Sequence, residues 1–270
     1  MTKRSRLASL VALSFVSAVG FAKPPSPTPT GVPAAAAPVP GAASVSLETL
    51  FAPYFVLLRA HVHGGRVDYA GLRHEGFADL KSFVSSLDRI APESLADERS
   101  RFALYLHAYN AFALFAAVER YPLTSVKNVP GFFTERKHRI GGRAYSLDEL
   151  EHEVLQKRFA DPRMHFALVC GAMSCPVLDP GLTAAERFEE GLEEGSRRFV
   201  ADESHVAFDE KAGVLRLSPL FDWFRADFDA KYGSVEKFLA LYLPDAEAKR
   251  LASRAWKKEY NAYDWSLNGN

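Results

Sequence analysis

Residues 102–118 read FALYLHAYNAFALFAAV, an apolar run whose main polar interruptions are His107 and Asn110. A helix that is apolar on every side is buried, either in the core of a protein or in a membrane. The run is about 17 residues long, whereas a bilayer span needs roughly 20, so we expect a core helix. We therefore predict that this segment is the central helix around which the other elements pack.

His107 and Asn110 are three residues apart, so they share one face of the predicted helix. Buried polar side chains need hydrogen-bond partners. We expect these partners in the helix that carries Glu151 and His152, and in the turn that carries Cys175. These are the other polar features set among apolar sequence.

Helices and hairpins are predicted on both sides of the central run. Before it, apolar residues at helical spacing predict amphipathic helices over 47–58, with Ser46 as the N-cap, and over 77–87. After it, we predict two hairpins, Thr134–Ile140 with Arg143–Ser146 and His205–Phe208 with Val214–Leu217. Capping boxes are predicted at Ser146–Glu149 and Thr183–Glu186. We also predict a buried strand at His165–Cys170 and helices that begin at Ser234 and Pro244. No βαβ rhythm connects them. The predicted class is α+β, a mostly helical single domain around a central buried helix with short β-hairpins.

The N-terminal region has the pattern of an export signal followed by a linker. A positively charged start, the apolar run 7–21 and a small-residue exit are typical of a secretory signal peptide. Residues 23–43 are rich in Pro and Ala, a composition that stays extended and forms no core. We predict a signal peptide over 1–22, a linker over 23–43 and one globular domain over 44–270. The protein would be periplasmic or secreted, with no stable membrane span after signal removal.

The charge and the composition of the chain exclude some classes of function. The 270 residues include 33 Lys and Arg and 33 Asp and Glu, so the formal net charge is zero. Binding through nucleic-acid phosphates relies on a basic excess, so we expect no nucleic-acid partner. The hydrophobic fraction of 48% and the charged fraction of 24% are usual for a packed globular protein. Two cysteines are too few for a disulfide scaffold, and we predict no cofactor.

The strongest chemical signal lies in residues 165–176, which read HFALVCGAMSCP. A proline at the first helical position would make Cys175 an N-cap-like residue, where free backbone N–H groups lower the pKa of a thiol. His152 or His165 would act as the general base, and Asn110 would orient the imidazole or stabilise an oxyanion. These residues predict a thiol-dependent hydrolase or acyl transferase.

Cys170 has other candidate roles. Alternation along the predicted strand puts His165 and Cys170 on opposite faces, which leaves Cys175 as the candidate nucleophile. A cysteine in an apolar strand is usually part of the core. In an exported protein, however, the two cysteines can also form a disulfide, and they would then support a redox or disulfide-exchange function. Four residues separate them, not the two of thioredoxin-like motifs.

Two further hypotheses remain open. His152, His165, Cys170 and Cys175 are ligand types that suit zinc, but their spacing matches no paired zinc motif. Alternatively, the protein is a non-catalytic exported binding module, in which aromatic residues of 221–224 and 260–265 line a groove. In each case the substrate or ligand would be a small molecule, a peptide or a component of the cell envelope.

Several segments together resemble the domain-of-unknown-function family 547. They are Val67-Asp68-Tyr69, Ala108-Tyr109-Asn110-Ala111, Leu150-Glu151-His152, His165–Cys170, Ser174-Cys175-Pro176 and the terminal Tyr263–Asn268. The likeness covers 44–227 and the terminal motif. One departure is His107, where the usual Asn-Ala-Tyr-Asn of the family has Asn. The family is common among exported bacterial proteins, so the resemblance implies an exported domain and no particular activity.

Overall fold

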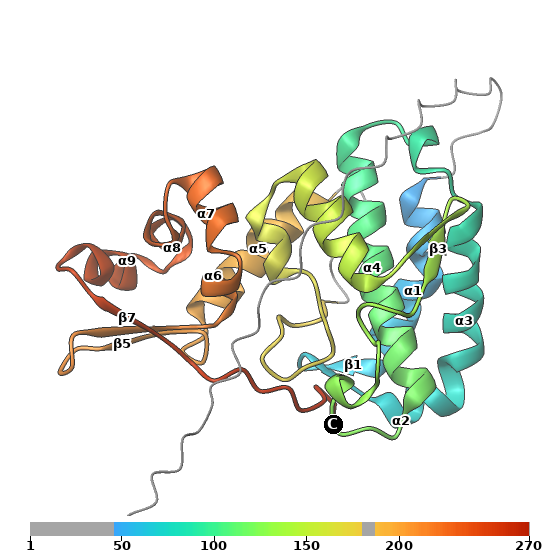
Figure 1. Cartoon of the computed structure of the whole chain (residues 1–270), viewed down its shortest axis with the longest axis horizontal. Coiled ribbons are helices and arrows are strands. Elements are labelled where there is room, and N and C mark those ends of the chain that lie inside the picture. Colours follow the sequence, from blue (N-terminus) through green and yellow to red (C-terminus); the bar gives the residue numbers. More distant parts are fainter. Residues whose placement is uncertain (1–45, 180–186, 270) are drawn as a thin grey trace, which may run out of the picture. The chain divides into compact units, whose positions relative to one another are not determined.

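The computed structural model describes residues 46–179 and 187–269 (Figure 1). The signal peptide predicted over 1–22, the linker predicted over 23–43 and the capping box predicted at Thr183–Glu186 lie outside the described residues. Within them, helices predominate, and the sheets have two or three strands each. The predicted class, a mostly helical α+β fold, is confirmed.

The elements follow the chain in the order of their labels. The α-helices of the described residues are α1 (Leu47–His61), α2 (Tyr69–Gly71), α3 (Phe77–Ser86), α4 (Glu98–Arg120), α5 (Phe188–Ala201), α6 (Leu220–Trp223), α7 (Arg225–Tyr232), α8 (Val235–Tyr242) and α9 (Asp245–Ala252). The π-helices are η1 (Leu72–Gly76) and η5 (Glu149–Phe159), and the 3-10 helices are η2 (Leu87–Arg89), η3 (Pro92–Ser94), η4 (Val126–Asn128) and η6 (Pro162–Phe166). The strands are β1 (Val62–His63), β2 (Arg66–Val67), β3 (His138–Ile140), β4 (Arg143–Tyr145), β5 (Val206–Asp209), β6 (Val214–Leu217) and β7 (Lys257–Tyr260).

Helix α4 is the central helix that the sequence predicts. Every residue from Phe102 to Val118 is buried, and α1 and α3 pack against the helix (Figure 1). Asp97 caps it by accepting a hydrogen bond from the backbone N–H of Ser100, so the helix begins earlier than predicted. Its 23 residues reach the length and composition of a membrane span, so the length argument against a span is wrong. Burial identifies it as a core helix instead, because 94% of its apolar window is covered by the rest of the protein.

The two polar residues of α4 have different surroundings. The side-chain amide of Asn110 donates to the carbonyl of Ala167, and its oxygen accepts from the N–H of Val169, each at 2.8 Å. The ring of His107 lies 5.3 Å from that of Phe51, centroid to centroid, within a group of aromatic rings. We predicted that Asn110 would bond to the helix that carries Glu151 and His152 and to the turn that carries Cys175. That prediction is wrong, because its side chain bonds to the backbone after η6 instead. Its bonds fix the chain that leads into the first cysteine.

The predicted caps and hairpins of the described residues are confirmed. Ser46 and Ser234 each accept a hydrogen bond from the backbone N–H three residues further on. At the start of η5, Ser146 accepts from the N–H of Glu149, and the Glu149 carboxylate accepts from the N–H of Ser146. This reciprocal pair is a capping box. Strands β3 and β4 form one antiparallel hairpin and β5 and β6 form another. Strand β3 begins at His138, four residues later than predicted, and the other three strands lie within one residue of their predicted bounds.

The strand predicted at His165–Cys170 is wrong. The 3-10 helix η6 occupies Pro162–Phe166, and the chain that follows it is irregular. The cause is local, because η6 begins with a proline and Asp161 caps it by accepting from the N–H of Arg163. After η6, the backbone bonds to the side chain of Asn110 instead of to a neighbouring strand.

A second cluster of buried apolar residues lies around α5 to α9 and the sheet β5-β6-β7. Strand β7 runs parallel to β6. The chain after β7 returns to the first cluster, where Leu267 pairs with Ala172. Met164 of η6 belongs to the first cluster and Phe166 to the second. Helix η6 therefore joins the two clusters.

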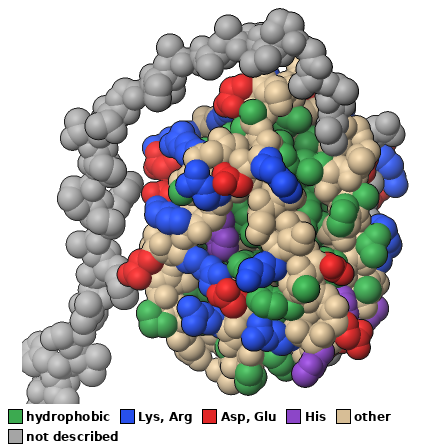
Figure 2. Space-filling view, turned by 90° about the vertical axis from the view of Figure 1, so that its right-hand side faces the viewer, with side chains coloured by type: hydrophobic (Ala, Val, Ile, Leu, Met, Phe, Trp, Pro, Cys, Tyr) green, Lys and Arg blue, Asp and Glu red, His purple; other side chains and the backbone are tan. Residues whose placement is uncertain are grey.

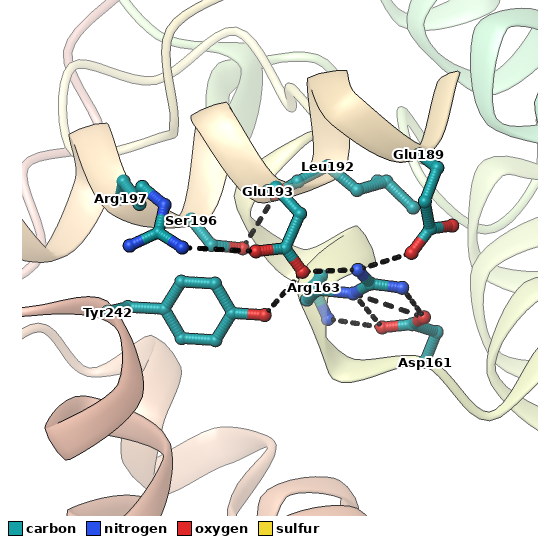
Figure 3. Close-up of polar contacts among 8 residues, drawn as sticks. All are labelled: Asp161, Arg163, Glu189, Leu192, Glu193, Ser196, Arg197 and Tyr242. Carbon is teal, nitrogen blue, oxygen red and sulfur yellow. Dashed lines mark hydrogen bonds and ion pairs between the residues drawn. The ribbon is translucent and has the colours of Figure 1, made fainter. Parts of the chain in front are cut away.

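Arg163 fixes η6 to its neighbours (Figure 3). Its guanidinium, in a side chain that is only 11% exposed, pairs with Asp161, with Glu189 and with Glu193. Tyr242 of α8 donates a hydrogen bond to the same Glu193. The network thereby ties η6 to α5 and α8.

Charged side chains of both signs are interspersed on the face of the molecule shown in Figure 2. On that face, the described residues form no large patch of a single sign. The mixed surface agrees with the formal net charge of zero.

Candidate functional site

Six stretches that are far apart in the sequence line a cavity of about 270 Å³. The lining comes from α4, from the turn before β3, from η5 and the residue before it, from η6 and the chain after it, from the region of α6, and from the segment after β7. The lining residues are Tyr109, Phe133, Asp148, Glu151, His152, His165, Leu168, Cys170, Cys175, Pro176, Leu220, Trp223, Phe224, Tyr263 and Trp265. The aromatic residues proposed for a groove near 221–224 and 260–265 thus include four that line this cavity.

Cys170 and Cys175 form a disulfide in the wall of the cavity. Cys175 is buried and Cys170 is half-buried. The backbone N–H of Cys170 donates to Sγ of Cys175 at 3.1 Å, and the hydroxyl of Tyr263 donates to the same sulfur at 3.2 Å. Burial, reinforced by the charge of Glu151, raises the pKa of Tyr263, so its hydroxyl keeps its proton and remains a donor. The Tyr263 hydroxyl also lies 3.6 Å from Sγ of Cys170, so Cys175 has two donors and Cys170 has one, at the longer distance.

His165 lies on η6 and is fixed on two sides. Its Nε2 is 2.7 Å from Oδ2 of Asp227, and its ring stacks on Phe224 with the centroids 3.7 Å apart. Burial disfavours the charge of Asp227, but the hydrogen bonds from His165 and Gln156 outweigh it and hold the pKa of Asp227 below its usual range. The carboxylate therefore accepts, and Nε2 of His165 donates. Nδ1 of His165 is buried and has no hydrogen-bond partner among the described residues.

His152 lies one helix away and is linked to the same carboxylate. Its Nδ1 is 3.0 Å from Oε1 of Gln156, four residues further along η5. The amide nitrogen of Gln156 in turn donates to both oxygens of Asp227, at 3.0 and 2.8 Å. Hydrogen bonds thus connect His152, through Gln156 and Asp227, to His165. His152 is the more accessible imidazole, with 43% of its side chain exposed, against 1% for His165.

Carboxylates supply the formal charge of the lining. Glu151 and Asp148 line the cavity, and no Lys or Arg does so in the part of the chain that the structure describes. The hydroxyl of Tyr109 bonds to Glu151, and burial together with that carboxylate raises the pKa of Tyr109 well above its usual value. Tyr109 therefore stays neutral and donates to Glu151.

The cavity brings together three of the four predicted catalytic residues, Cys175, His152 and His165. Asn110 does not line it, and both polar ends of its side chain are bonded to backbone instead. The alternation argument that separated His165 from Cys170 is wrong, because the predicted strand does not form and both residues line the cavity.

Several site residues were missed at the sequence level. Asp227 and Gln156 lie in amphipathic helical sequence, where an acidic or amide side chain is ordinary, and no local signal distinguishes them. Tyr263 belongs to the terminal motif Tyr263–Asn268, so its signal was visible, but its contact with the cysteine pair was not. Among the residues of 46–179 and 187–269, no three His, Cys, Asp or Glu side chains are grouped so that they could hold a metal ion.

Residues 92–200 match the model of a protein family described as "Protein of unknown function, DUF547". Comparison with curated proteins finds no match, and neither does comparison with solved structures. The matched region contains α4, η5, η6 and both cysteines, whereas Trp223, Asp227 and Tyr263 lie outside it. The expected resemblance to the DUF547 family is therefore confirmed over residues 92–200.

Proposed function

We propose that the cavity is a site of thiol–disulfide exchange, in which Cys170 and Cys175 alternate between a disulfide and two thiols. The observation that carries this proposal is the disulfide in the cavity wall with two hydrogen-bond donors on one sulfur. Donors to a thiolate stabilise its charged form, which makes that sulfur the better leaving group. Cys175 is then the leaving sulfur, and the half-buried Cys170 is the sulfur that is attacked.

The first step consumes one substrate thiol. Nδ1 of His165 accepts the thiol proton, and the substrate thiolate attacks Sγ of Cys170. A substrate–Cys170 disulfide forms as the bond between the two protein sulfurs breaks, and the electron pair leaves on Sγ of Cys175. The N–H of Cys170 and the hydroxyl of Tyr263 stabilise that thiolate.

The second step releases the oxidised substrate. A second substrate thiol gives its proton to the Cys175 thiolate and attacks the substrate sulfur of the mixed disulfide. The electron pair leaves on Sγ of Cys170, which takes the proton held by His165. Two substrate thiols have then become one disulfide, and the protein disulfide has become two thiols. The reverse reaction reduces a disulfide substrate with the same two cysteines.

A pair of single variants tests this assignment. With a small disulfide as the substrate, Cys175→Ser should trap a mixed disulfide at Cys170, because the resolving thiol is absent. Cys170→Ser should trap one at the buried Cys175 several times more slowly. Intact-mass measurements over time give both rates. If Cys175 reacts faster than Cys170, or if the wild-type disulfide is reduced only in denaturant, the exchange proposal is wrong.

A second candidate function is acyl transfer or hydrolysis by the reduced protein. The observation that favours it is the buried pair of His165 and Asp227 in the same cavity as the cysteines. Cys175 would be the nucleophile, and His165 would be its base. Reduced protein should then hydrolyse an activated ester such as p-nitrophenyl acetate, with loss of activity in Cys175→Ala. An oxidised protein that is equally active would contradict this function.

We also propose that the protein is exported, because a positively charged start, the apolar run 7–21 and a Pro-rich stretch precede the domain. An oxidising compartment is where a structural or catalytic disulfide persists. N-terminal sequencing of the protein recovered from the cell envelope or medium tests this. A mature N-terminus after residue 22 is expected, and an intact Met1 in the cytoplasmic fraction would contradict export.

A further inference from the structure

We propose that the thiol substrate of this cavity carries a cationic amine, so that the site recognises an aminothiol or its disulfide. The inference rests on the proposed exchange function and adds to it the chemical class of the substrate. It is drawn from the aromatic rings, the carboxylates and the unpartnered imidazole nitrogen of the lining.

Aromatic rings form one wall of the cavity. The ring centroid of Tyr263 lies 4.9 Å from that of Trp223 and 4.6 Å from that of Trp265, and the two tryptophans are 6.2 Å apart. Trp223 is 51% exposed, so this wall is open to an incoming molecule. Trp is the best ring partner for an ammonium group. Trp265 already has one cation near its ring, because Nζ of Lys127 lies 4.8 Å from the centroid.

Among the described residues, no Lys or Arg side chain neutralises the two carboxylates that line the cavity. Asp148 and Glu151 line it, and in the described chain neither forms an ion pair with Lys or Arg. Asp148 approaches only the imidazole of His152, at 3.6 Å, and Glu151 bonds to the neutral hydroxyl of Tyr109. Two carboxylates beside aromatic rings attract a cation and repel an anion.

The imidazole of His165 points to the same conclusion. Its Nε2 donates to Asp227, so in the neutral ring Nδ1 carries a lone pair and can only accept. This nitrogen belongs to a side chain that is 1% exposed and lines the cavity, yet it has no hydrogen-bond partner in the described structure. Buried polar atoms are normally hydrogen-bonded. A partner for Nδ1 must be a donor, and the thiol and the ammonium of an aminothiol both can donate.

The decisive experiment compares three small thiols of similar size on the oxidised full-length protein. They are cysteamine, which is cationic, mercaptoethanol, which is neutral, and mercaptoacetate, which is anionic. The rate at which each reduces the protein disulfide is divided by its rate on hydroxyethyl disulfide, which removes differences in intrinsic thiol reactivity. We expect the corrected rate of cysteamine to exceed that of mercaptoethanol about tenfold. Mercaptoacetate should be slower than mercaptoethanol.

Two variants, each of which removes one carboxylate charge from η5, test whether Glu151 causes the preference for cysteamine. Glu151→Gln should bring the ratio of the cysteamine rate to the mercaptoethanol rate several-fold closer to one. Glu153→Gln removes the same charge from the same helix, but Glu153 is exposed, pairs with Lys157 and does not line the cavity. It should leave the ratio unchanged. Equal ratios in the wild type and Glu151→Gln, or an equal loss in both variants, would overturn the inference.

A binding measurement separates this inference from the exchange function. Tetramethylammonium should quench the tryptophan fluorescence of the oxidised protein in the wild type and less in Glu151→Gln, whereas tert-butanol, its neutral analogue, should not. If none of the three thiols reduces the disulfide but this quenching occurs, exchange is wrong and cation recognition is supported. If neither a rate preference nor quenching is seen, cation recognition is wrong, whether or not exchange takes place.

Discussion

The acidity of Cys175 should depend in part on a hydroxyl that lies 88 residues further along the chain. Tyr263 donates to Sγ of this residue, and a donor stabilises the thiolate relative to the thiol. In the reduced protein, Tyr263→Phe should therefore raise the pKa of Cys175. A hydrogen bond to a charged group corresponds to about one pKa unit or somewhat more. The ultraviolet absorbance of the thiolate, followed during a pH titration, measures the change.

Tyr260 provides the matched control for this substitution. Its hydroxyl accepts a hydrogen bond from Arg225, and it does not line the cavity. Tyr260→Phe should leave the titration of the thiols unchanged. An equal change in the two variants would mean that Tyr263 acts through general stability and not through its bond to sulfur.

Asn110 has a structural task that can be measured separately. Its side chain satisfies one buried carbonyl and one buried N–H of the segment after η6. Asn110→Leu leaves both unsatisfied and should lower the free energy of unfolding by roughly 1–3 kcal/mol or more. Asn128→Leu, at an exposed asparagine that bonds to Thr124, should cost less than about 0.5 kcal/mol. Urea unfolding compares the two, and a silent Asn110→Leu would contradict this role.

At the scale of single residues, the sequence predicts those site members whose chemistry is unusual in their setting. In the sequence, Cys175 stands out because it precedes Pro176, and His165 stands out because it lies beside a turn. Both residues line the cavity. Asp227 does not stand out, because an exposed-looking acidic residue in a helix is common. Only the fold brings it to within 2.7 Å of His165, which lies 62 residues earlier.

The helix η5 depends on the capping box at its start. Ser146 and Glu149 each satisfy a backbone N–H of the other, and Glu151 and His152 of this helix line the cavity. Ser146→Ala should lower the free energy of unfolding by about 0.5–2 kcal/mol, as the loss of an N-cap usually does. The change can be followed by thermal unfolding monitored by circular dichroism.

Ser253 gives a contrasting case for the capping argument. It is exposed after α9, and its hydroxyl donates to the carbonyl of Arg250. Ser253→Ala should change stability by less than about 0.5 kcal/mol. If Ser146→Ala is as mild, the capping box does not contribute measurably to this helix.

At the scale of elements, periodic apolar spacing predicts the long helices well, because α1, α3 and α4 bury one face or all faces. It fails for the apolar segment His165–Cys170. A short apolar run suits a strand, a buried turn or a 3-10 helix equally, and the start of η6 at a capped proline decides among them. Local hydrogen bonding, not hydrophobicity, determines that outcome.

The ion-pair network of Arg163 should contribute to the stability of the whole domain. Its side chain is 11% exposed, whereas that of Glu189 is 51% exposed and that of Glu193 is 36% exposed. Arg163→Met leaves the carboxylates without their shared cation. The loss should exceed the roughly 1 kcal/mol of an exposed pair but stay below the roughly 3–5 kcal/mol of a fully buried one. Urea unfolding at constant salt measures it.

Arg187 offers an exposed ion pair for comparison. Its side chain is 59% exposed and pairs with Glu190. Arg187→Met should cost no more than about 1 kcal/mol. Equal losses for Arg163→Met and Arg187→Met would show that the Arg163 network behaves as a surface pair and does not tie η6 to α5 and α8.

The whole-molecule arrangement is the part that one sequence does not predict. Two apolar clusters, joined by η6 and by the segment after β7, follow from contacts between residues far apart in the chain. In the sequence, nothing distinguishes the apolar residues of one cluster from those of the other. The part of the cavity wall that Tyr263 and Trp265 form follows from the return of the chain after β7 to the first cluster, and it lies against Trp223 of α6.

That returning segment sets an order of events during synthesis. Cys175 and Tyr263 are 88 residues apart, so at roughly 5–20 residues per second the ribosome makes the thiols several seconds or more before the tyrosine that covers them. Throughout that interval both sulfurs lack the wall that later surrounds them. The cavity therefore cannot be completed until the segment after β7 has been made, and a growing chain carries its cysteine pair before it has the site around that pair.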